Sequence, residues 1–317
     1  MADHLIEPRG PFSLAAARDF AGGFAAGIGG GAATGTSIVM AFPIEPRPAT
    51  GEWAKSAVVE LTQVERNGSV TARVATDGDP AAALAQAQRC VSLDHDGSGW
   101  PDVGKRDPVI GDLQATYEDL RPVCFYSAYE AATSFVIGQR ISRVQASRVK
   151  ARLSERTGDE LEVDGVRYHA FPRPERLLQV DAVEGLPAEK VRRLHGLAEA
   201  ALDGRLDTNR LRSLPASDAL TELRTLHGIG EFSAQGILLR GCGLVDQLPD
   251  DALSDDVLAT MYADDVARGM TTTDIVSRWV PYRTWATVLL RVGWGRGVGE
   301  GQSYRRGRAL PGKPRVS

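Results

Sequence analysis

The chain has 317 residues, 43% hydrophobic and 25% charged, which is enough apolar mass for a sizeable core and a length that suits two domains. Its three cysteines, Cys90, Cys124 and Cys242, stand far apart and exclude a disulfide framework, a zinc knuckle and a four-cysteine iron–sulfur cluster. No apolar run approaches the roughly 18 residues of a membrane helix, and the charged N-terminus differs from a secretory signal, so we expect a cytoplasmic protein without a membrane partner.

The charge of the chain is unevenly distributed. Residues 1–120 carry nine basic and 16 acidic side chains, whereas residues 121–317 carry 28 basic and 25 acidic ones, so the net charge of −4 conceals a positive second part. An anionic partner would therefore meet the second part. Residues 300–317 are expected to form a flexible basic tail, for which a purely solvated role is an equal alternative.

The first 116 residues indicate a small unit of strands and helices. A short helix at Ser13–Phe20 precedes the glycine-dense segment Gly22–Gly31, which predicts a loop. This segment lacks the flanking elements and the GK[ST] or GxGxxG spacing of a nucleotide-binding loop, so a nucleotide-dependent enzyme is a disfavoured alternative. Asn67-Gly68 predicts a hairpin turn. Antiparallel strands are expected at Ser37–Phe42, Ala57–Val64 and Ser69–Thr76, followed by a helix from Pro80 to Arg89 that Asp79 caps.

From Tyr117 onward, helical periodicity replaces β-branched alternation and predicts a compact all-α bundle. Ser142 is expected to cap one of its helices and Gly158 to end it. The fold class is therefore α+β, with a small N-terminal antiparallel β/α domain (1–116), an all-α domain (117–299) and the tail (300–317). The helices are expected at Ser127–Arg140, Val144–Thr157, Pro174–Ala182, Ala188–Leu202, Ala216–Thr225, Phe232–Gly241, Asp255–Met261, Thr272–Arg278 and Tyr282–Val292.

The most informative segment is 226–234, with the sequence LHGIGEFSA. A helix that ends at Thr225, a tight Gly228-Ile229-Gly230 turn and a second helix predict a helix–hairpin–helix. Two glycines would allow left-handed torsions and close approach of a partner, and the free amides of the second helix would form an anion site suited to a phosphate. Such contacts read no base sequence. A plain helix–helix turn is the alternative.

About twenty residues after the hairpin, the segment LPDDAL (248–253) adds an aspartate behind a proline. A hairpin followed by a Gly/Pro-rich loop and an aspartate resembles the helix–hairpin–helix DNA glycosylase superfamily, closest to its DNA-3-methyladenine glycosylase II branch. The Gly-Gln segment 137–142, the Ala-rich segment 197–204 and the Trp-x-Pro segment 279–286 also resemble that branch. The resemblance is strong over residues 120–294 and weak over 1–115.

The resemblance implies that Asp251 is the catalytic residue. Cleavage of an N-glycosidic bond makes the deoxyribose oxocarbenium-like, and a fixed carboxylate would stabilise that charge and orient water. An alkylated purine already carries positive charge and leaves without a strong general acid. Asp250 is expected to be exposed or to cap the next helix, and a capping role for both aspartates is the alternative.

The resemblance also implies contacts with duplex DNA and a pocket with π faces for the extruded base, on which a cationic base gains cation–π attraction. The expected DNA-binding residues are Gln139, Arg140, His227, Gly228, Ile229, Gly230 and Ser233, and for Gln139 a purely structural role in a hydrogen-bond network is an equal alternative. The expected pocket residues are Phe232, Tyr126, Tyr129 and Trp285. Core packing is an equal alternative for the last three.

Departures from the superfamily refine these expectations. Phe232 stands where bifunctional members have a lysine that forms a Schiff base, which implies a monofunctional hydrolase without lyase activity. Arg140 replaces a leucine that, in the family, often wedges into the gap left by the flipped base. Arg291 stands at about the position where relatives have a second tryptophan of the base pocket. Both replacements suggest the alternative of a non-catalytic protein that binds damaged DNA through the same hairpin.

No cofactor is expected. The aspartates and histidines lack the spacing of a calcium loop or a zinc site. The family's hairpin can bind a monovalent cation through backbone carbonyls, which would involve residues 226–231. The resemblance implies a monomeric base-excision repair enzyme, associated with the nucleoid, that acts on alkylated purines of the 3-methyladenine type in double-stranded DNA.

Overall fold

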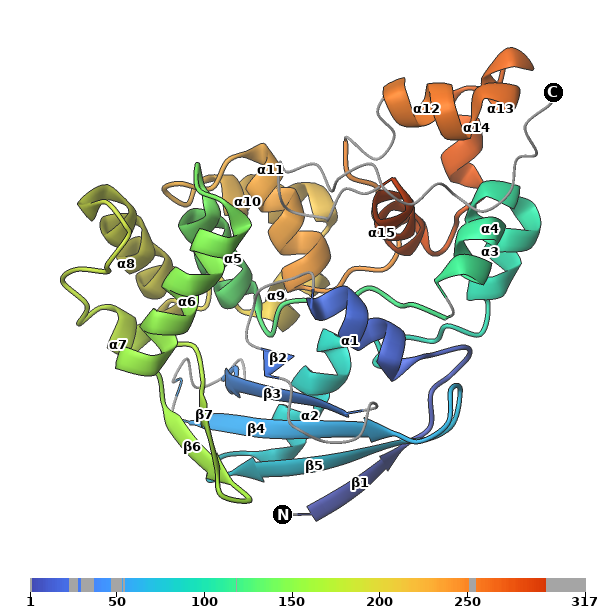
Figure 1. Cartoon of the computed structure of the whole chain (residues 1–317). Helices are drawn as coiled ribbons and strands as arrows, with labels where there is room; N and C mark the ends of the chain where they lie inside the picture. The colour runs from blue at the N-terminus through green and yellow to red at the C-terminus, as the bar shows by residue number, and fades with distance from the viewer. Residues whose placement is uncertain are drawn as a thin grey trace.

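A computed structural model describes residues 2–22, 28–29, 37–46, 53, 55–117, 119–250 and 255–294 (Figure 1). Most of the segment Gly22–Gly31 and all of the tail at 300–317 lie outside the described residues, as does Asp251. Within the described part of the chain, no helix combines the length and the apolar character needed to cross a membrane.

An antiparallel five-stranded sheet occupies the N-terminal part, in the order β1-β5-β4-β3-β2. Its strands are β1 (Ala2–Ile6), β2 (Ile28–Gly29), β3 (Ser37–Pro43), β4 (Ser56–Gln63) and β5 (Val70–Thr76). The three inner strands confirm the prediction, and Asn67 takes the left-handed conformation (φ 63°) in the turn between β4 and β5. β1 escapes the prediction because Asp3 and His4 interrupt its apolar pattern, and it is a strand through its pairing with β5.

One face of the sheet packs against two helices, α1 (Leu14–Gly22) and α2 (Pro80–Cys90) (Figure 1). Phe42 and Leu61 of the sheet are buried beside Ala83 and Ala87 of α2. As predicted, Asp79 caps α2, because its carboxylate accepts from the first two free amides at 2.9 and 3.2 Å. This helical face forms the core of the N-terminal part.

The other face of the sheet meets a β-hairpin that the sequence pattern does not predict, β6 (Glu160–Val163) and β7 (Val166–His169). The predicted all-α bundle therefore contains two short strands. Each has four residues, which is too few to show an alternation of apolar and polar side chains. The apolar side chains of this hairpin pack on β3 and β4 and are Leu161, Val163 and Tyr168. Gly158 ends the preceding helix with an ordinary φ of −73°; it must be glycine because a Cβ would lie 1.9 Å from the carbonyl oxygen of Ala170.

The other helices largely follow the predicted succession. They are α3 (Trp100–Arg106), α4 (Pro108–Thr116), α5 (Ala128–Gly138), α6 (Arg143–Thr157), α7 (Pro174–Leu177), α8 (Ala188–Leu202), α9 (Thr208–Ser213), α10 (Ala216–Arg224), α11 (Glu231–Gly236), the π-helix η1 (Ile237–Gly241), α12 (Asp255–Met261), α13 (Ala263–Ala267), α14 (Thr272–Ser277) and α15 (Arg283–Gly293). Ser142 caps α6 as predicted, in a reciprocal capping box with Gln145. The helices α3, α4, α9 and α13 escape the prediction. Each of α3 and α4 contains a proline and a glycine, which are typical of turns, and α9 and α13 have too few apolar residues to show a helical period.

Asp107 connects α4 to the last helices of the described chain. The carboxylate is fully buried, and its Oδ1 accepts from the amides of Val109 (3.0 Å) and Ile110 (3.2 Å) at the start of α4. Its Oδ2 accepts from the hydroxyl of Tyr262 (3.1 Å) and the indole of Trp279 (2.7 Å). Four donors compensate the buried charge, so α3 and α4 pack with α14 and α15 in one apolar cluster.

Arg121 connects the N-terminal part to α15. Its side chain is fully buried, and its guanidinium donates to the carbonyls of Arg9 (2.6 Å), Pro11 (2.9 Å), Ser92 (3.1 Å) and His95 (3.3 Å). The rings of Phe12 and Trp285 lie 5.6 and 5.3 Å from its central carbon. Burial lowers the pKa of Arg121 to about 10. The cation thus joins segments that are more than 100 residues apart.

We predict that Arg121→Met lowers the free energy of unfolding by about 3 to 5 kcal/mol, because it leaves buried carbonyls without donors. Urea unfolding monitored by circular dichroism measures this loss. Arg9→Met is the matched control, since the side chain of Arg9 is 63% exposed in a 3.9 Å ion pair with Asp96 and should matter little. Equal losses in the two variants would contradict the role of Arg121.

Candidate functional site

The predicted helix–hairpin–helix is present, with α10 before the turn and α11 after it. Gly228 has a φ of +92°, a torsion that favours glycine, and a Cβ there would lie 2.8 Å from Cδ of Arg193, so this side chain would have to move. Gly230 corrects the expectation of two left-handed glycines: its φ is −93°, and a Cβ would meet no atom within 4 Å. Gly230 therefore leaves open space beside the first turn of α11, whose amides have no acceptor within the helix.

Gln139 joins the end of α5 to this hairpin. Its Nε2 donates to the carbonyl of Gly228 (2.7 Å), and its Oε1 accepts from NH1 of Arg193 (3.1 Å). Lys190 donates to the backbone carbonyls of Gln139 (2.5 Å) and Ile137 (2.8 Å) and so caps the C-terminal end of α5. The side-chain amide of Gln139 is thus used within the protein, which supports the structural alternative for this residue.

The predicted DNA-binding residues around Gln139 and the hairpin differ in exposure. Arg140 is exposed and has a φ of +59°, an uncommon torsion for a residue with a side chain, directly after the anchored Gln139. His227 is also exposed, with Nε2 3.5 Å from a carboxylate oxygen of Glu189. Ile229 and Ser233 are buried, so they support the hairpin from inside. Of the predicted DNA-binding side chains, Arg140 and His227 are the ones that face solvent.

Three positively charged side chains lie close together near Gln139: Arg140, Lys190 and Arg193. Burial lowers the pKa of Lys190, and the neighbouring charges of Arg193 and Arg140 lower it further. Arg193 is balanced by Glu189, whose carboxylate lies 3.1 Å from its Nε. Across the ranges that the structure describes, no acidic side chain forms an ion pair with Arg140.

Phe232, the predicted pocket residue on α11, is half exposed (50%). Its ring meets Phe135 of α5 edge to face, with centroids 6.0 Å apart and planes at 87°. Phe125 supports Phe135 from another side at 6.0 Å. The sequence motifs do not single out Phe135, although it precedes Gln139 by one helical turn and so shares a face with it.

Asp250 is bound by a residue of α11, the helix that carries Phe232. Gln235 accepts from the Asp250 amide (3.2 Å) and donates to its Oδ2 (2.5 Å). Asp250 is exposed, as expected. The predicted catalytic residue, Asp251, is the next in the chain and lies outside the described residues, so its geometry stays a prediction.

The other three predicted pocket residues lie in separate hydrophobic clusters and are not brought to Phe232. Tyr126 packs on Phe42 of the sheet at 4.9 Å. Tyr129 donates to the carbonyl of Pro172 (3.1 Å) within the helical core. Trp285 packs between Arg121, Trp100 and Tyr282. All three are at most 4% exposed, and their contacts favour the core-packing alternative.

The helix that starts at the hairpin continues as the π-helix η1, a form that is rare and often found at functional sites. Arg240 of η1 is buried, with its central carbon 5.2 Å from the ring of Phe20, and it donates to the carbonyl of Val123. Burial lowers the pKa of Arg240, and Arg291 of α15 contributes repulsion. Arg291 therefore adds its charge to a region that already holds a buried cation.

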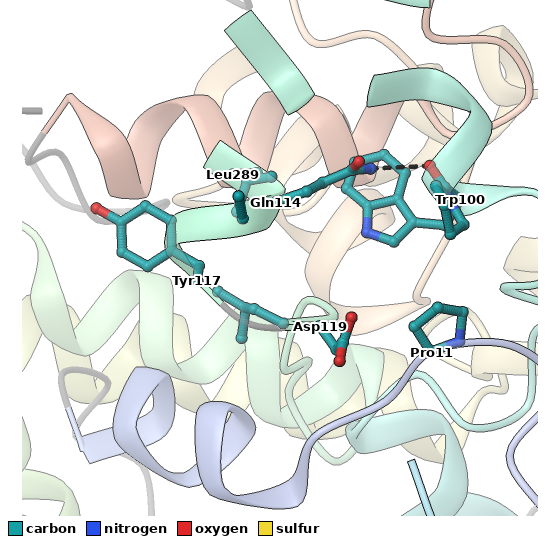
Figure 2. Close-up of a pocket in the computed structure, with 9 residues that line it drawn as sticks. Pro11, Trp100, Gln114, Tyr117, Asp119 and Leu289 are labelled. Carbon is teal, nitrogen blue, oxygen red and sulfur yellow. Dashed lines mark hydrogen bonds between the residues drawn. The ribbon is translucent and has the colours of Figure 1, made fainter. Parts of the chain in front are cut away.

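A pocket of about 230 Å³ lies between the segment before α1, the helices α3 and α4, and α15 (Figure 2). It is lined by Pro11, Trp100, Pro101, Gln114, Ala115, Tyr117, Asp119, Leu120 and Leu289. In Figure 2, Gln114 donates to the carbonyl of Trp100 (2.8 Å) beside the indole. None of these lining residues belongs to the hairpin, α5 or α11, so this pocket is separate from the predicted site.

Among the residues with described positions, no group of three or more histidine, cysteine, aspartate or glutamate side chains is arranged to hold a metal ion. The expected monovalent cation would use backbone carbonyls, so this finding does not test it. One carbonyl of the 226–231 segment, that of Gly228, accepts from Gln139.

No family model matches the chain. It is 31% identical over 185 residues to the DNA-3-methyladenine glycosylase 2 of Escherichia coli, covering 56% of this chain and 62% of that protein. It is 26% identical over 201 residues to the DNA-3-methyladenine glycosylase of Bacillus subtilis, covering 61% and 65%. The match thus spans less than two thirds of the length of these relatives.

Among solved structures, the 3-methyladenine DNA glycosylase of Archaeoglobus fulgidus aligns with a TM-score of 0.67 at 19% identity and covers 91% of this chain and 97% of that one. The 8-oxoguanine glycosylase/lyase of Clostridium acetobutylicum in complex with DNA aligns with a TM-score of 0.53 at 18% identity, covering 81% and 94%. These structures show a shared fold. Together with the curated relatives they support the resemblance: the chain is similar in sequence to DNA-3-methyladenine glycosylases over part of its length, and it shares the fold of solved DNA glycosylases.

Proposed function

We propose that the protein is a monofunctional DNA glycosylase that extrudes alkylated purines of the 3-methyladenine type from duplex DNA and hydrolyses their glycosidic bond. The observation that carries the proposal is the arrangement of α11. Phe232 exposes an aromatic ring there, and Gln235, three residues later on the same helix, holds Asp250. Asp250, the last described residue before position 251, is therefore bound to the helix that carries the exposed ring.

The hairpin would hold the DNA strand. The space at Gly230 allows a phosphate to approach the amides that begin α11. Gln139 would act by fixing the carbonyl side of the turn at Gly228. Arg140 and His227, the exposed side chains beside it, would add charge toward the duplex.

The chemistry would belong to Asp251, whose carboxylate would stabilise the oxocarbenium-like sugar and orient water. A Schiff-base route needs a free amine. Phe232 occupies the position of that lysine, and Lys190, the lysine that touches Gln139, donates its ammonium to two carbonyls. This arrangement supports hydrolysis without strand cleavage.

We also propose that the chain is a monomer with two domains. A boundary between residues 116 and 117 would leave α3 and α4 in the first domain, although both pack in one cluster with α15. We therefore expect the first domain to fold around contacts with the second, within a monomer.

We predict that Asp251→Asn lowers the release of 3-methyladenine from methylated DNA by at least about 100-fold, because the amide cannot stabilise positive charge on the sugar. Chromatography of the released bases measures it, and filter binding should show unchanged affinity for DNA. Asp250→Asn, which keeps an acceptor for Gln235, is the matched control and should stay close to wild type. Full turnover of Asp251→Asn would rule out the mechanism.

We predict that borohydride traps no covalent adduct between the protein and damaged DNA, since no amine is available at position 232. The treated strand should break only after alkali, which marks an abasic site. A trapped adduct would show lyase chemistry. Bound but intact DNA would instead favour the alternative of a damage-binding protein.

We predict that Arg140→Gln reduces the slope of log affinity against log salt concentration by about 0.9, the value for one lost phosphate contact. Binding to unmodified duplex over a salt series measures the slope. Arg192→Gln is the control, because Arg192 is already paired with Glu189 at 2.5 Å. An unchanged slope in Arg140→Gln would remove Arg140 from the DNA interface.

A further inference from the structure

Gly236 lies one helical turn after Phe232 on α11, and its backbone does not explain why it is glycine. Its torsions, φ −60° and ψ −39°, are those of an ordinary helix, where glycine is about 0.5 to 1 kcal/mol less favourable than alanine. A Cβ at this position, however, would lie 2.2, 2.8 and 3.0 Å from Cζ, Cε2 and Cε1 of Phe135. The missing side chain therefore makes room for the outer edge of the Phe135 ring.

The Phe135 ring is fixed on several sides. Gly236 contacts its edge, Phe125 supports it at 6.0 Å, and Phe232 meets it at right angles. Among the described residues, Phe232 is the only exposed aromatic side chain, so the pair presents an open ring next to a fixed one. Two perpendicular rings form a corner. A flat molecule in that corner can stack its face on one ring and point its edge at the other.

The same helical face also carries Gln235. Residues 232, 235 and 236 are spaced i, i+3 and i+4 and so lie together on one side of α11. Gln235 holds Asp250 there through two hydrogen bonds. Phe232 and the residue that binds Asp250 thus lie on the same side of α11.

We propose that Phe135 is a specificity-determining residue of the base site, and that Gly236 exists to admit its ring. The inference rests on the proposed function. A positively charged purine that stacks on Phe232 would gain cation–π attraction from two rings, whereas a neutral purine of similar shape would gain only contact area. Phe135 would therefore set the preference for cationic over neutral lesions.

The test compares the excision of 7-methylguanine, which is cationic, with that of hypoxanthine, which is neutral, as kcat/KM for each base. In Phe135→Leu the ratio should fall by about tenfold, because the apolar volume is largely kept while the π face is lost. Phe171→Leu is the control: Phe171 is a buried ring of the helical core, so its loss should lower Tm without changing the ratio.

Gly236→Ala provides a second variant with an intact Phe135. The added Cβ would displace the ring, so both the ratio and Tm should fall. The drop in Tm should be smaller in the Phe135→Leu background, where the ring is absent. Gly196→Ala on α8 is the matched control, because a Cβ there meets no atom within 4 Å and Tm should be unchanged or higher.

The outcomes separate the two proposals. If the wild type releases neither base, the proposed function is wrong and the inference falls with it. If the wild type excises 7-methylguanine and both Phe135→Leu and Gly236→Ala keep its ratio to hypoxanthine, the inference alone is overturned. An equal fall of kcat/KM for both bases would also overturn it, because the Phe135 ring would then have only a structural role.

Discussion

The buried guanidinium of Arg121 determines how the parts of the molecule are joined. It donates to four carbonyl oxygens, two before α1 and two after α2, while the ring of Trp285 on α15 covers one of its faces. Because a buried cation is costly without its acceptors, these segments cannot separate without losing a large part of the stability. This side chain thus links α15 to the segments that flank the sheet.

A series of smaller contacts connects this framework to the candidate site. Gln139 fixes the hairpin to the end of α5, the edge of Phe135 fits against Gly236, and Gln235 holds Asp250 on α11. Each contact joins a helix to the next segment of the site, so the hairpin, the aromatic pair and Asp250 are connected through α5 and α11. Stabilisation of a developing charge requires groups that are held in place.

The sequence predicts the parts of this arrangement that depend on local patterns. The caps at Asp79 and Ser142, the hairpin turn at Asn67-Gly68 and the hairpin around Gly228 each follow from residues a few positions apart. The sequence does not predict contacts between distant segments, such as the place that Gly236 leaves for Phe135. The same reason explains Tyr126, Tyr129 and Trp285, whose burial depends on neighbours that only the fold supplies.

The charges around the site restrict how a cationic base could be recognised. Arg291 repels the buried Arg240, and at the pocket position that the resemblance gives to Arg291 its charge would also repel such a base. Attraction would then have to come from a carboxylate or from π electrons. The carboxylate of the proposed mechanism acts on the sugar, so recognition of the base itself falls to the aromatic rings. An open Phe232 beside a fixed Phe135 supplies that attraction without placing another negative charge next to the DNA phosphates.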